Sequence, residues 1–344
     1  MRNTGYDQEI RRGRRQCVRY RHRRRSPQSV AIDTMCRVFV KNAVRIWALQ
    51  PNLHWPFTSI DQVAALAPLP SSARVQRVHL PSCPAELIST AGSSARRAIL
   101  YLHGGAFLTC GLNTHRSLAA RLSSSADAEV LNVGYRMLPA HGLSAALSDA
   151  VDGLRWLLRR GYRWSDIVVA GDSAGGYLAL QTAAELLRQG HPPTAGVAAI
   201  SPLTTLKPLD KSPGRNDRCA MFTARAMTSF MRYIAAHGEK NPSGHRISSP
   251  VDADLRRMPP VTIHVSSDEF LRPDAELMYE RLTDAGAQCD LHMWDGQIHD
   301  FPLAAAVLPE GRRAIRYIGD FVKQVAPASD ESLDAQEYPP AASQ

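Results

Sequence analysis

One run of residues combines a candidate nucleophile with the kind of turn that would expose it. Gly171-Asp172-Ser173-Ala174-Gly175 follows an apolar run at residues 167–170 and precedes a helical pattern at residues 175–188. A serine on a tight turn between a strand and a helix is raised above the sheet edge, where flanking glycines avoid clashes. The alternative is a serine that merely caps the helix. The strand–turn–helix context favours Ser173 as the nucleophile of a serine hydrolase.

A serine hydroxyl also needs donors for the oxyanion that forms when it attacks a carbonyl group. His103-Gly104-Gly105 comes directly after a strand-like run that ends at Leu102. Two glycines after a strand allow backbone N–H groups to turn toward a single oxygen. The sequence therefore predicts an oxyanion hole formed by the N–H groups of Gly104, Gly105 and Ala174.

The general base and its acid partner are expected later in the chain, each after a strand. His299 follows the last strand-like run, at residues 289–294, and precedes the final helical pattern. Asp268 follows the run at residues 261–265, and its carboxylate would hold the imidazole of His299 in the required tautomer. Glu269 and Asp274 are rivals for that role, and Asp268 could instead cap the next helix. Three other histidines are expected to be structural: His103, His264 and His292.

The elements that must position these residues alternate between short apolar runs and longer helical patterns. Such alternation is typical of a mostly parallel sheet covered by helices on both faces. A hairpin at one sheet edge is expected from residues 75–80 and 85–89. The strand-like runs are 98–102, 130–133, 167–170, 197–200, 261–265 and 289–294, and the helical patterns are 114–123, 144–159, 175–188, 274–285 and 312–325.

Two segments depart from this rhythm and are expected to form a helical cap. Residues 27–60 begin with a helical apolar pattern, and residues 203–258 contain no strand-like run but a cluster of Met and Phe. The second segment would be a lid over the active site or a surface subdomain without substrate contact. The predicted catalytic domain covers residues 61–326, including this insertion. A disordered tail is expected at residues 327–344.

The positive charge of the chain is concentrated at its beginning. The net charge is +9, and the first 25 residues contain ten arginines against two acidic residues. Residues 1–26 are therefore predicted to be a disordered arm, and nucleic-acid binding is not expected of the fold. The arm could contact an anionic membrane, act as a targeting segment, have no specific role, or precede a true start at Met35. No apolar run of membrane-spanning length is present.

The order of these motifs resembles the bacterial hormone-sensitive-lipase-like branch of the α/β-hydrolases, over roughly residues 75–325. That resemblance implies an α/β-hydrolase fold with a helical cap, a triad of Ser173, Asp268 and His299, and hydrolysis of short- to medium-chain acyl esters without a metal or cofactor. The chain departs from the usual family pattern at Ala106, Glu269 and Asp300, where Gly, Pro and Gly are usual. The acyl pocket is expected to involve Phe107, Tyr177, Met221, Phe222 and Phe301.

Other activities and surroundings remain open at this point. The same triad would serve an amidase or a thioesterase, and the fold could also hold a small ligand without catalysis. The six cysteines are scattered without metal-ligand spacing, which favours reduced thiols in a cytoplasmic protein. A peripheral membrane contact through the arm and a homodimer are compatible with the sequence.

Overall fold

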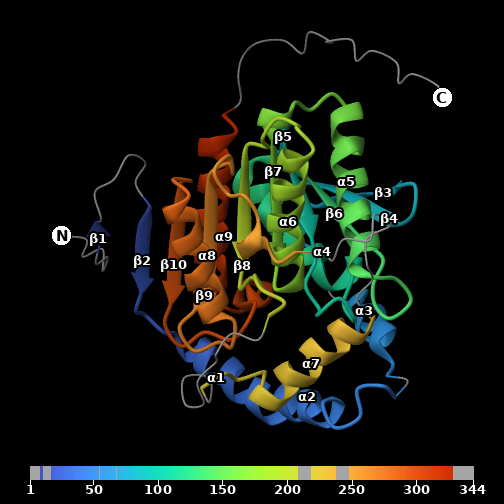
Figure 1. The fold of residues 1–344 in the computed structure, drawn as a ribbon, viewed down its shortest axis with the longest axis vertical. Coiled ribbons are helices and arrows are strands. Elements are labelled where there is room, and N and C mark those ends of the chain that lie inside the picture. The colour runs from blue at the N-terminus through green and yellow to red at the C-terminus, as the bar shows by residue number, and fades with distance from the viewer. Residues whose placement is uncertain are drawn as a thin grey trace.

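The protein is built on one ten-stranded sheet, seen in a computed structural model that describes residues 8–10, 17–53, 55–66, 68–207, 218–237 and 248–327. Its strand order is β1-β2-β10-β9-β8-β7-β5-β6-β4-β3 (Figure 1). The strands from β2 to β6 in this order are parallel, while β1 and the β4–β3 pair at the two ends are antiparallel. The strands are β1 (Gln8–Ile10), β2 (Val18–His22), β3 (Arg74–His79), β4 (Pro84–Ser89), β5 (Ser94–Leu102), β6 (Ala128–Val133), β7 (Ile167–Asp172), β8 (Gly196–Ile200), β9 (Val261–Ser266) and β10 (Cys289–Trp294).

Helices cover both faces of the sheet, as the alternating pattern predicts. On one face lie α5 (Leu143–Arg159), α6 (Ala174–Arg188) and α8 (Arg272–Asp284), and on the other lie α4 (Leu112–Ala126) and α9 (Pro309–Val325). Alternate residues of β5 show why the central strands are apolar throughout. Leu100 packs into the core under α5 and α6, whereas Ile99 and Tyr101 pack under α4 and α9. Each central strand is therefore buried on both faces.

The first edge of the sheet corrects one prediction. Residues 1–26 were predicted to be disordered, but Val18–His22 forms β2 and pairs in parallel with β10. Arginine alternates with other residues along this strand. Arg19 reaches Glu280 at 3.4 Å and Arg21 reaches Asp295 at 3.1 Å. These exposed ion pairs offset part of the positive charge, and the parallel pairing with β10 places the strand in the sheet. Residues 1–7 and 11–16, and the tail predicted at 328–344, lie outside the described residues.

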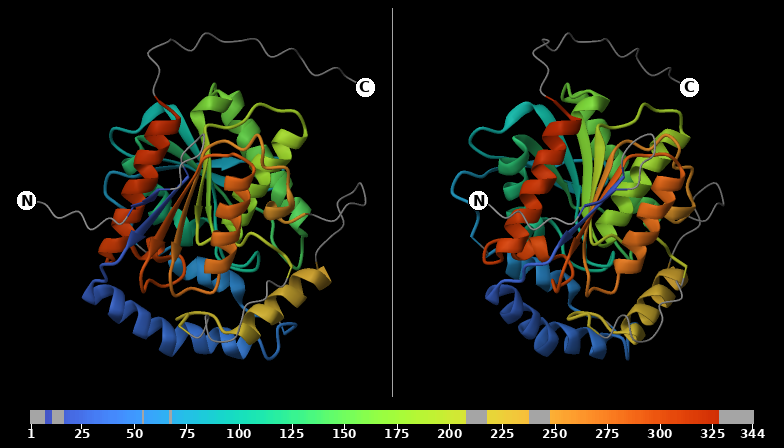
Figure 2. Two further views of the ribbon diagram at one scale, coloured as in Figure 1. Left: turned by 60° about the vertical axis from the view of Figure 1, so that its left-hand side comes forward. Right: turned by 90° about the vertical axis from the view of Figure 1, so that its left-hand side faces the viewer.

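A group of helices, called the cap below, lies beyond one end of the sheet (Figures 1 and 2). The cap comprises α1 (Pro27–Met35), the π-helix η1 (Cys36–Val40), α2 (Lys41–Trp47), α3 (Phe57–Ala64) and α7 (Ala224–His237). Hydrogen bonds join its segments: Lys41 Nζ donates to the Cys219 carbonyl at 2.8 Å, Ser229 Oγ donates to the Ala48 carbonyl at 3.0 Å, and Arg37 donates to the Arg218 carbonyl. Within the described part of residues 203–258 there is no strand. The role of this segment as a lid stays a prediction.

Candidate active site

Ser173 lies on a sharp turn between β7 and α6. Its backbone has φ 52° and ψ −116°, an arrangement that costs energy for a residue with a side chain. The turn is held by a 2.8 Å hydrogen bond from the Ser173 N–H to the Ile200 carbonyl. A Cβ atom on Gly175 would overlap the carbonyl oxygen of Leu102, so this position has no room for a side chain. The packing around the turn therefore accounts for the glycine and leaves the serine partly exposed.

His299 is the residue that contacts Ser173. It lies in the loop after β10, and its Nε2 is 2.9 Å from Ser173 Oγ. The side chain is almost completely buried, and the ring of Phe222 packs edge-on against the imidazole with centroids 5.0 Å apart. Because Phe222 comes from the segment just before α7, the cap contributes directly to the surroundings of His299. The sequence-predicted serine and histidine are thus brought together.

The carboxylate on the other side of His299 belongs to Glu269, which corrects the predicted contact with Asp268. Glu269 Oε2 is 3.2 Å from His299 Nδ1 and also accepts a 2.7 Å hydrogen bond from Ser201 Oγ. The side chain of Glu269 is buried. Asp268 is half-exposed, and its carboxylate instead accepts a hydrogen bond from Ser267 Oγ at 2.8 Å. The other rival, Asp274, is buried beside Thr204, to whose N–H its carboxylate is bonded at 3.2 Å.

A second carboxylate lies on the same imidazole. Asp300 Oδ2 is 3.0 Å from His299 Nε2, the nitrogen that also faces Ser173. Burial on its own would lower the pKa of His299, but the carboxylates of Asp300 and Glu269 outweigh it and raise that pKa well above its usual value. Burial raises the pKa of Asp300 to about 7, with a further contribution from the nearby Asp172 and against the opposing effect of His299. The two carboxylates thus favour the imidazolium form of His299.

In the loop after β5, the N–H of Gly104, one of the predicted oxyanion donors, has another partner. The N–H of Gly104 donates to Asp172 Oδ1 at 3.0 Å, so this group is already satisfied and the prediction for Gly104 is corrected. Asp172 is fully buried and also accepts from Tyr101 Oη at 2.7 Å, and His115 Nε2 lies 3.0 Å from its Oδ2. Burial would raise the pKa of Asp172, but His115 and the hydrogen bond from Tyr101 lower it. This buried carboxylate anchors the loop beneath Ser173.

Three backbone N–H groups in the loop after β5 and at the start of α6 have no protein acceptor among the described residues. Among the described residues, the N–H groups of Gly105, Ala106 and Ala174 make no hydrogen bond to a protein acceptor. Gly105 and Ala106 have φ values of 111° and 58°, which turn the chain sharply after the strand. Ala174 begins α6, so its N–H lies at the positive end of the helix dipole. Ala106 was noted in the sequence only as a departure from the family pattern.

The residues predicted to line an acyl pocket lie in different surroundings. Phe107 and Tyr177 are completely buried and pack edge to face, with ring centroids 5.8 Å apart. Phe301 is also buried, but it packs on Trp294 in a separate apolar cluster. Met221 is half-buried beside Phe222, whose ring packs on His299, and the Tyr177 N–H donates to the Ser173 carbonyl at 3.1 Å. The pocket role of these residues stays a prediction.

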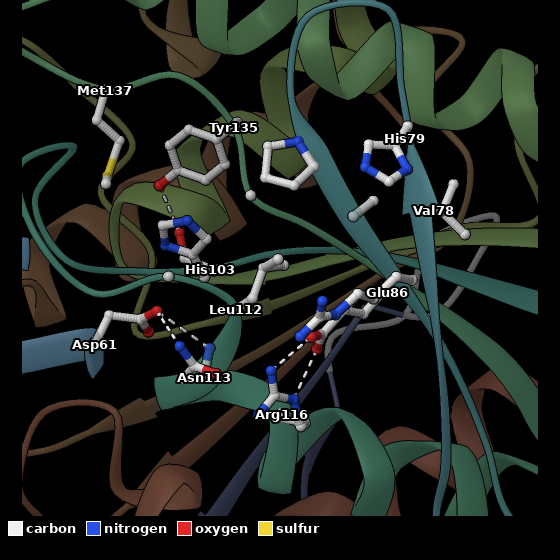
Figure 3. A pocket seen from close by; sticks show the side chains of 15 residues that line it. Asp61, Val78, His79, Glu86, His103, Leu112, Asn113, Arg116, Tyr135 and Met137 are labelled. Atoms are coloured by element: carbon white, nitrogen blue, oxygen red, sulfur yellow. Dashed lines mark hydrogen bonds and ion pairs between the residues drawn. The ribbon is translucent and has the colours of Figure 1, made fainter. Parts of the chain in front are cut away.

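Figure 3 shows a cavity of about 470 Å³ beside the same loop. It is lined on one side by His103 and Tyr135, whose rings stack with centroids 4.2 Å apart. Tyr135 Oη donates a 2.6 Å hydrogen bond to the His103 carbonyl, so the pair supports the chain just before Gly104. His103 is therefore structural, as expected, and none of the candidate triad residues lines this cavity. His264 and His292 are likewise buried in the sheet and stacked on each other.

The described residues hold neither a candidate metal cluster nor a candidate membrane-spanning helix. No cluster of three or more His, Cys, Asp or Glu residues there is placed to hold a metal ion. No helix among the described residues is long and apolar enough to cross a membrane. All six cysteines are free thiols, and five of them are buried.

Comparison with known proteins identifies the class to which this fold and site belong. The family model for the alpha/beta hydrolase fold matches residues 99–303, which cover more than half of the chain. The chain is 30% identical to the esterase EstE5 in a crystal structure soaked with p-nitrophenyl butyrate, with a TM-score of 0.76 over 88% of this chain and 99% of that one. An esterase of the bacterial hormone-sensitive lipase family matches at 28% identity with a TM-score of 0.76 over 88% of this chain and 99% of that one.

Curated relatives narrow this class. The chain is 41% identical to the esterase LipU of Mycobacterium tuberculosis over 294 residues, which are 83% of this chain and 98% of LipU. It is also 41% identical to the carboxylesterase/phospholipase LipF of the same organism over 264 residues, which are 74% of this chain and 70% of LipF. The chain therefore belongs to the α/β-hydrolase family, in its bacterial hormone-sensitive-lipase-like branch, and is a carboxylic ester hydrolase. The predicted fold and family are confirmed.

Proposed function

We propose that this esterase works through an acyl-enzyme on Ser173, with His299 as the general base and Glu269 as its carboxylate partner. The observation that carries the proposal is the continuous contact from Ser173 Oγ to His299 Nε2 at 2.9 Å and from His299 Nδ1 to Glu269 Oε2 at 3.2 Å. Both distances are within reach of proton transfer and orientation. The class of ester hydrolase to which the chain belongs supports the same roles.

In this mechanism His299 takes the proton from Ser173 as the hydroxyl attacks the carbonyl carbon of the ester. Glu269 stabilises the imidazolium and keeps its proton-bearing nitrogen in place, without becoming protonated itself. His299 then gives the proton to the departing alcohol. Water repeats both transfers on the acyl-enzyme, releasing the acid and restoring the free serine.

The oxyanion is assigned to the N–H groups of Gly105, Ala106 and Ala174. These groups lack protein acceptors among the described residues, whereas the N–H of Gly104 is taken by Asp172. A preorganised donor costs no rearrangement during the reaction, and losing one typically reduces the rate about 10²–10³-fold. The third position of the glycine motif can be alanine because only its backbone is used.

Short- to medium-chain acyl esters are the proposed substrates. The completely buried Phe107 and Tyr177 fill space on the core side of the site, and Phe222 covers His299 from the cap. Relative EstE5 was soaked with p-nitrophenyl butyrate. Initial rates with p-nitrophenyl esters of increasing chain length should be highest among the shorter ones. A steady rise to palmitate would contradict the assignment. The cytoplasmic location and the homodimer stay predictions.

The triad is tested by replacing each carboxylate separately. Ser173→Ala should abolish hydrolysis of p-nitrophenyl butyrate, and Glu269→Gln should lower kcat by about 10⁴-fold, as loss of the acid partner does in other triads. Asp268→Asn is the matched control, because the two positions are adjacent and both changes remove one charge. It should stay close to wild type. The reverse ranking, with Asp268→Asn the more damaging, would restore the assignment made from the sequence.

A further inference from the structure

Exposed apolar side chains are concentrated on the N-terminal helices of the cap. Of the fourteen large apolar residues that are exposed in the described part of the chain, ten lie within residues 30–66. Isolated exposed apolar residues are common on protein surfaces, but a contiguous group of them marks a contact with something else. The ten are Val30, Met35, Val38, Phe39, Ile46, Leu49, Leu53, Ile60, Val63 and Leu66.

The central members of this group form one stripe, called the apolar stripe below and defined as Met35, Val38, Phe39, Ile46, Leu49 and Leu53. Successive members are separated by one, three, four or seven positions. Met35, Val38, Phe39 and Ile46 lie on α1, η1 and α2, and Leu49 and Leu53 lie in the turns that follow α2. Cys36 and Ala48, in the same stretch of chain, are buried. The helices therefore already pack one face on the protein. The apolar stripe is a second face, turned to solvent.

The segments around the apolar stripe carry a strong positive charge. Residues 23–53 and 218–237 contain nine Lys and Arg against a single acidic residue, Asp33. Asp33 is already engaged with Arg37 at 2.8 Å and with Arg25 at 3.5 Å. A groove of about 630 Å³ between α7 and the turns that follow α2 places Leu49 of the stripe beside Arg225 and Arg232. Both arginines are exposed.

The apolar stripe and the positive charge around it favour an anionic lipid surface, and not a second copy of the chain, as the binding partner. In a two-fold dimer the same patch would meet itself, and two basic faces would repel each other across the contact. A bilayer with anionic headgroups instead satisfies both parts of the surface. Apolar side chains of an amphipathic helix enter the boundary between headgroups and acyl chains, while arginines remain with the phosphates.

We propose that the outer face of the cap, formed by the apolar stripe with Arg225 and Arg232, binds the surface of an anionic lipid bilayer. The helices would lie in the plane of the interface. Since Phe222 of the cap also touches His299, this contact would bring the active site close to esters dissolved in the bilayer. Binding itself does not depend on hydrolysis, so it is separable from the proposed function.

The test uses the full chain carrying Ser173→Ala, which removes hydrolysis from the measurement. Co-sedimentation is measured with vesicles of equal parts phosphatidylcholine and phosphatidylglycerol, and with vesicles of phosphatidylcholine alone. The protein should bind the mixed vesicles preferentially. Adding Phe39→Ser and Ile46→Ser should weaken that binding at least about tenfold, since both substitutions remove side chains that would leave water. Val307→Ser is the matched control, because Val307 and Ile46 are both 58% exposed. It should bind like the parent.

The charged part of the surface has its own pair of variants. Arg225→Glu with Arg232→Glu should weaken binding to the mixed vesicles, whereas Arg316→Glu, exposed on α9 outside the cap, should have a smaller effect. Unchanged binding by the Phe39→Ser, Ile46→Ser protein would overturn the proposal and assign the affinity to other basic residues such as the N-terminal arginines. A dimer in light scattering that the same substitutions dissociate, without vesicle binding by the parent, would identify a second copy as the occupant and also overturn it.

Discussion

The carboxylate of Asp300 predicts an unusual dependence of activity on pH. Asp300 Oδ2 and Ser173 Oγ both face His299 Nε2, at 3.0 Å and 2.9 Å. An ionised Asp300 favours the imidazolium and holds its proton, whereas attack by Ser173 needs a neutral imidazole. The wild-type enzyme should therefore become active only as pH rises through a titration above the usual histidine range. The substitution Asp300→Asn removes this charge and keeps the size of the side chain.

The size of the effect follows from the geometry. Two unit charges about 4 Å apart at an effective dielectric constant of about 20 interact by about 4 kcal/mol, which is about 3 pKa units. The raised pKa of Asp300, about 7, means that part of this interaction is lost through protonation of the carboxyl group itself. A downward shift of about 1–2 units in the acid limb is therefore expected for Asp300→Asn.

The measurement is kcat/KM for p-nitrophenyl butyrate across pH 5 to 9, read at the isosbestic wavelength of the product. This parameter reports ionisations of the free enzyme. Asp295→Asn is the control, because Asp295 lies in the same loop but pairs with Arg21 rather than with His299. Asp300→Gly adds a second check, since glycine adopts the φ of 51° at this position without strain. An acid limb that stays in place in both Asp300 variants would refute the reasoning.

Two further predictions concern stability. His115→Asn should lower the free energy of unfolding in urea by about 3 kcal/mol, because it leaves the fully buried Asp172 without its cationic partner; a loss below about 1 kcal/mol would show that the pair is dispensable. Burial, together with Arg313, lowers the pKa of His22 to about 4, so the folded protein excludes a proton that the unfolded chain binds below about pH 6.5. Stability should thus fall as pH decreases from about 6.5 to 5, by about 2 kcal/mol for this group, and His22→Phe should remove that part of the loss in thermal melts.

The interior of the sheet was predictable from the sequence because burial on both faces leaves a simple signal. Runs such as residues 167–170 and 197–200 are apolar throughout, and each became a central parallel strand. The edge strand β2 was missed because its arginines suggest disorder. Its period of two was the overlooked signal: Arg19 and Arg21 alternate with Tyr20 and His22, whose rings stack on His292 or Trp294. The high arginine content of this segment obscured the alternating pattern of β2, which pairing with β10 favours.

The sequence predicted which loops carry the candidate site, but not every contact that the site residues make. Ser173 and His299 are each fixed by a strand end and a turn, so motif order was enough to pair them. Which donors face the oxyanion depended on a long-range contact, the hydrogen bond from the Gly104 N–H to Asp172, that no local pattern contains. The departure from the family pattern at position 300, where Asp stands in place of the usual Gly, was visible in the sequence. Its contact with the imidazole required the left-handed backbone at that residue, with φ 51°.

The turn after β9 explains why Glu269, and not the predicted Asp268, contacts His299. The Asp268 N–H donates to Ser266 Oγ at 3.1 Å, and its carboxylate accepts from Ser267, so this side chain closes the turn locally. Glu269, one residue further along, has an additional methylene group that lets its carboxylate reach His299. Ser201 Oγ binds that carboxylate and also accepts the Asp300 N–H at 3.2 Å. One hydroxyl therefore positions both carboxylate-bearing residues that flank the imidazole, which couples the orientation of the base to its titration.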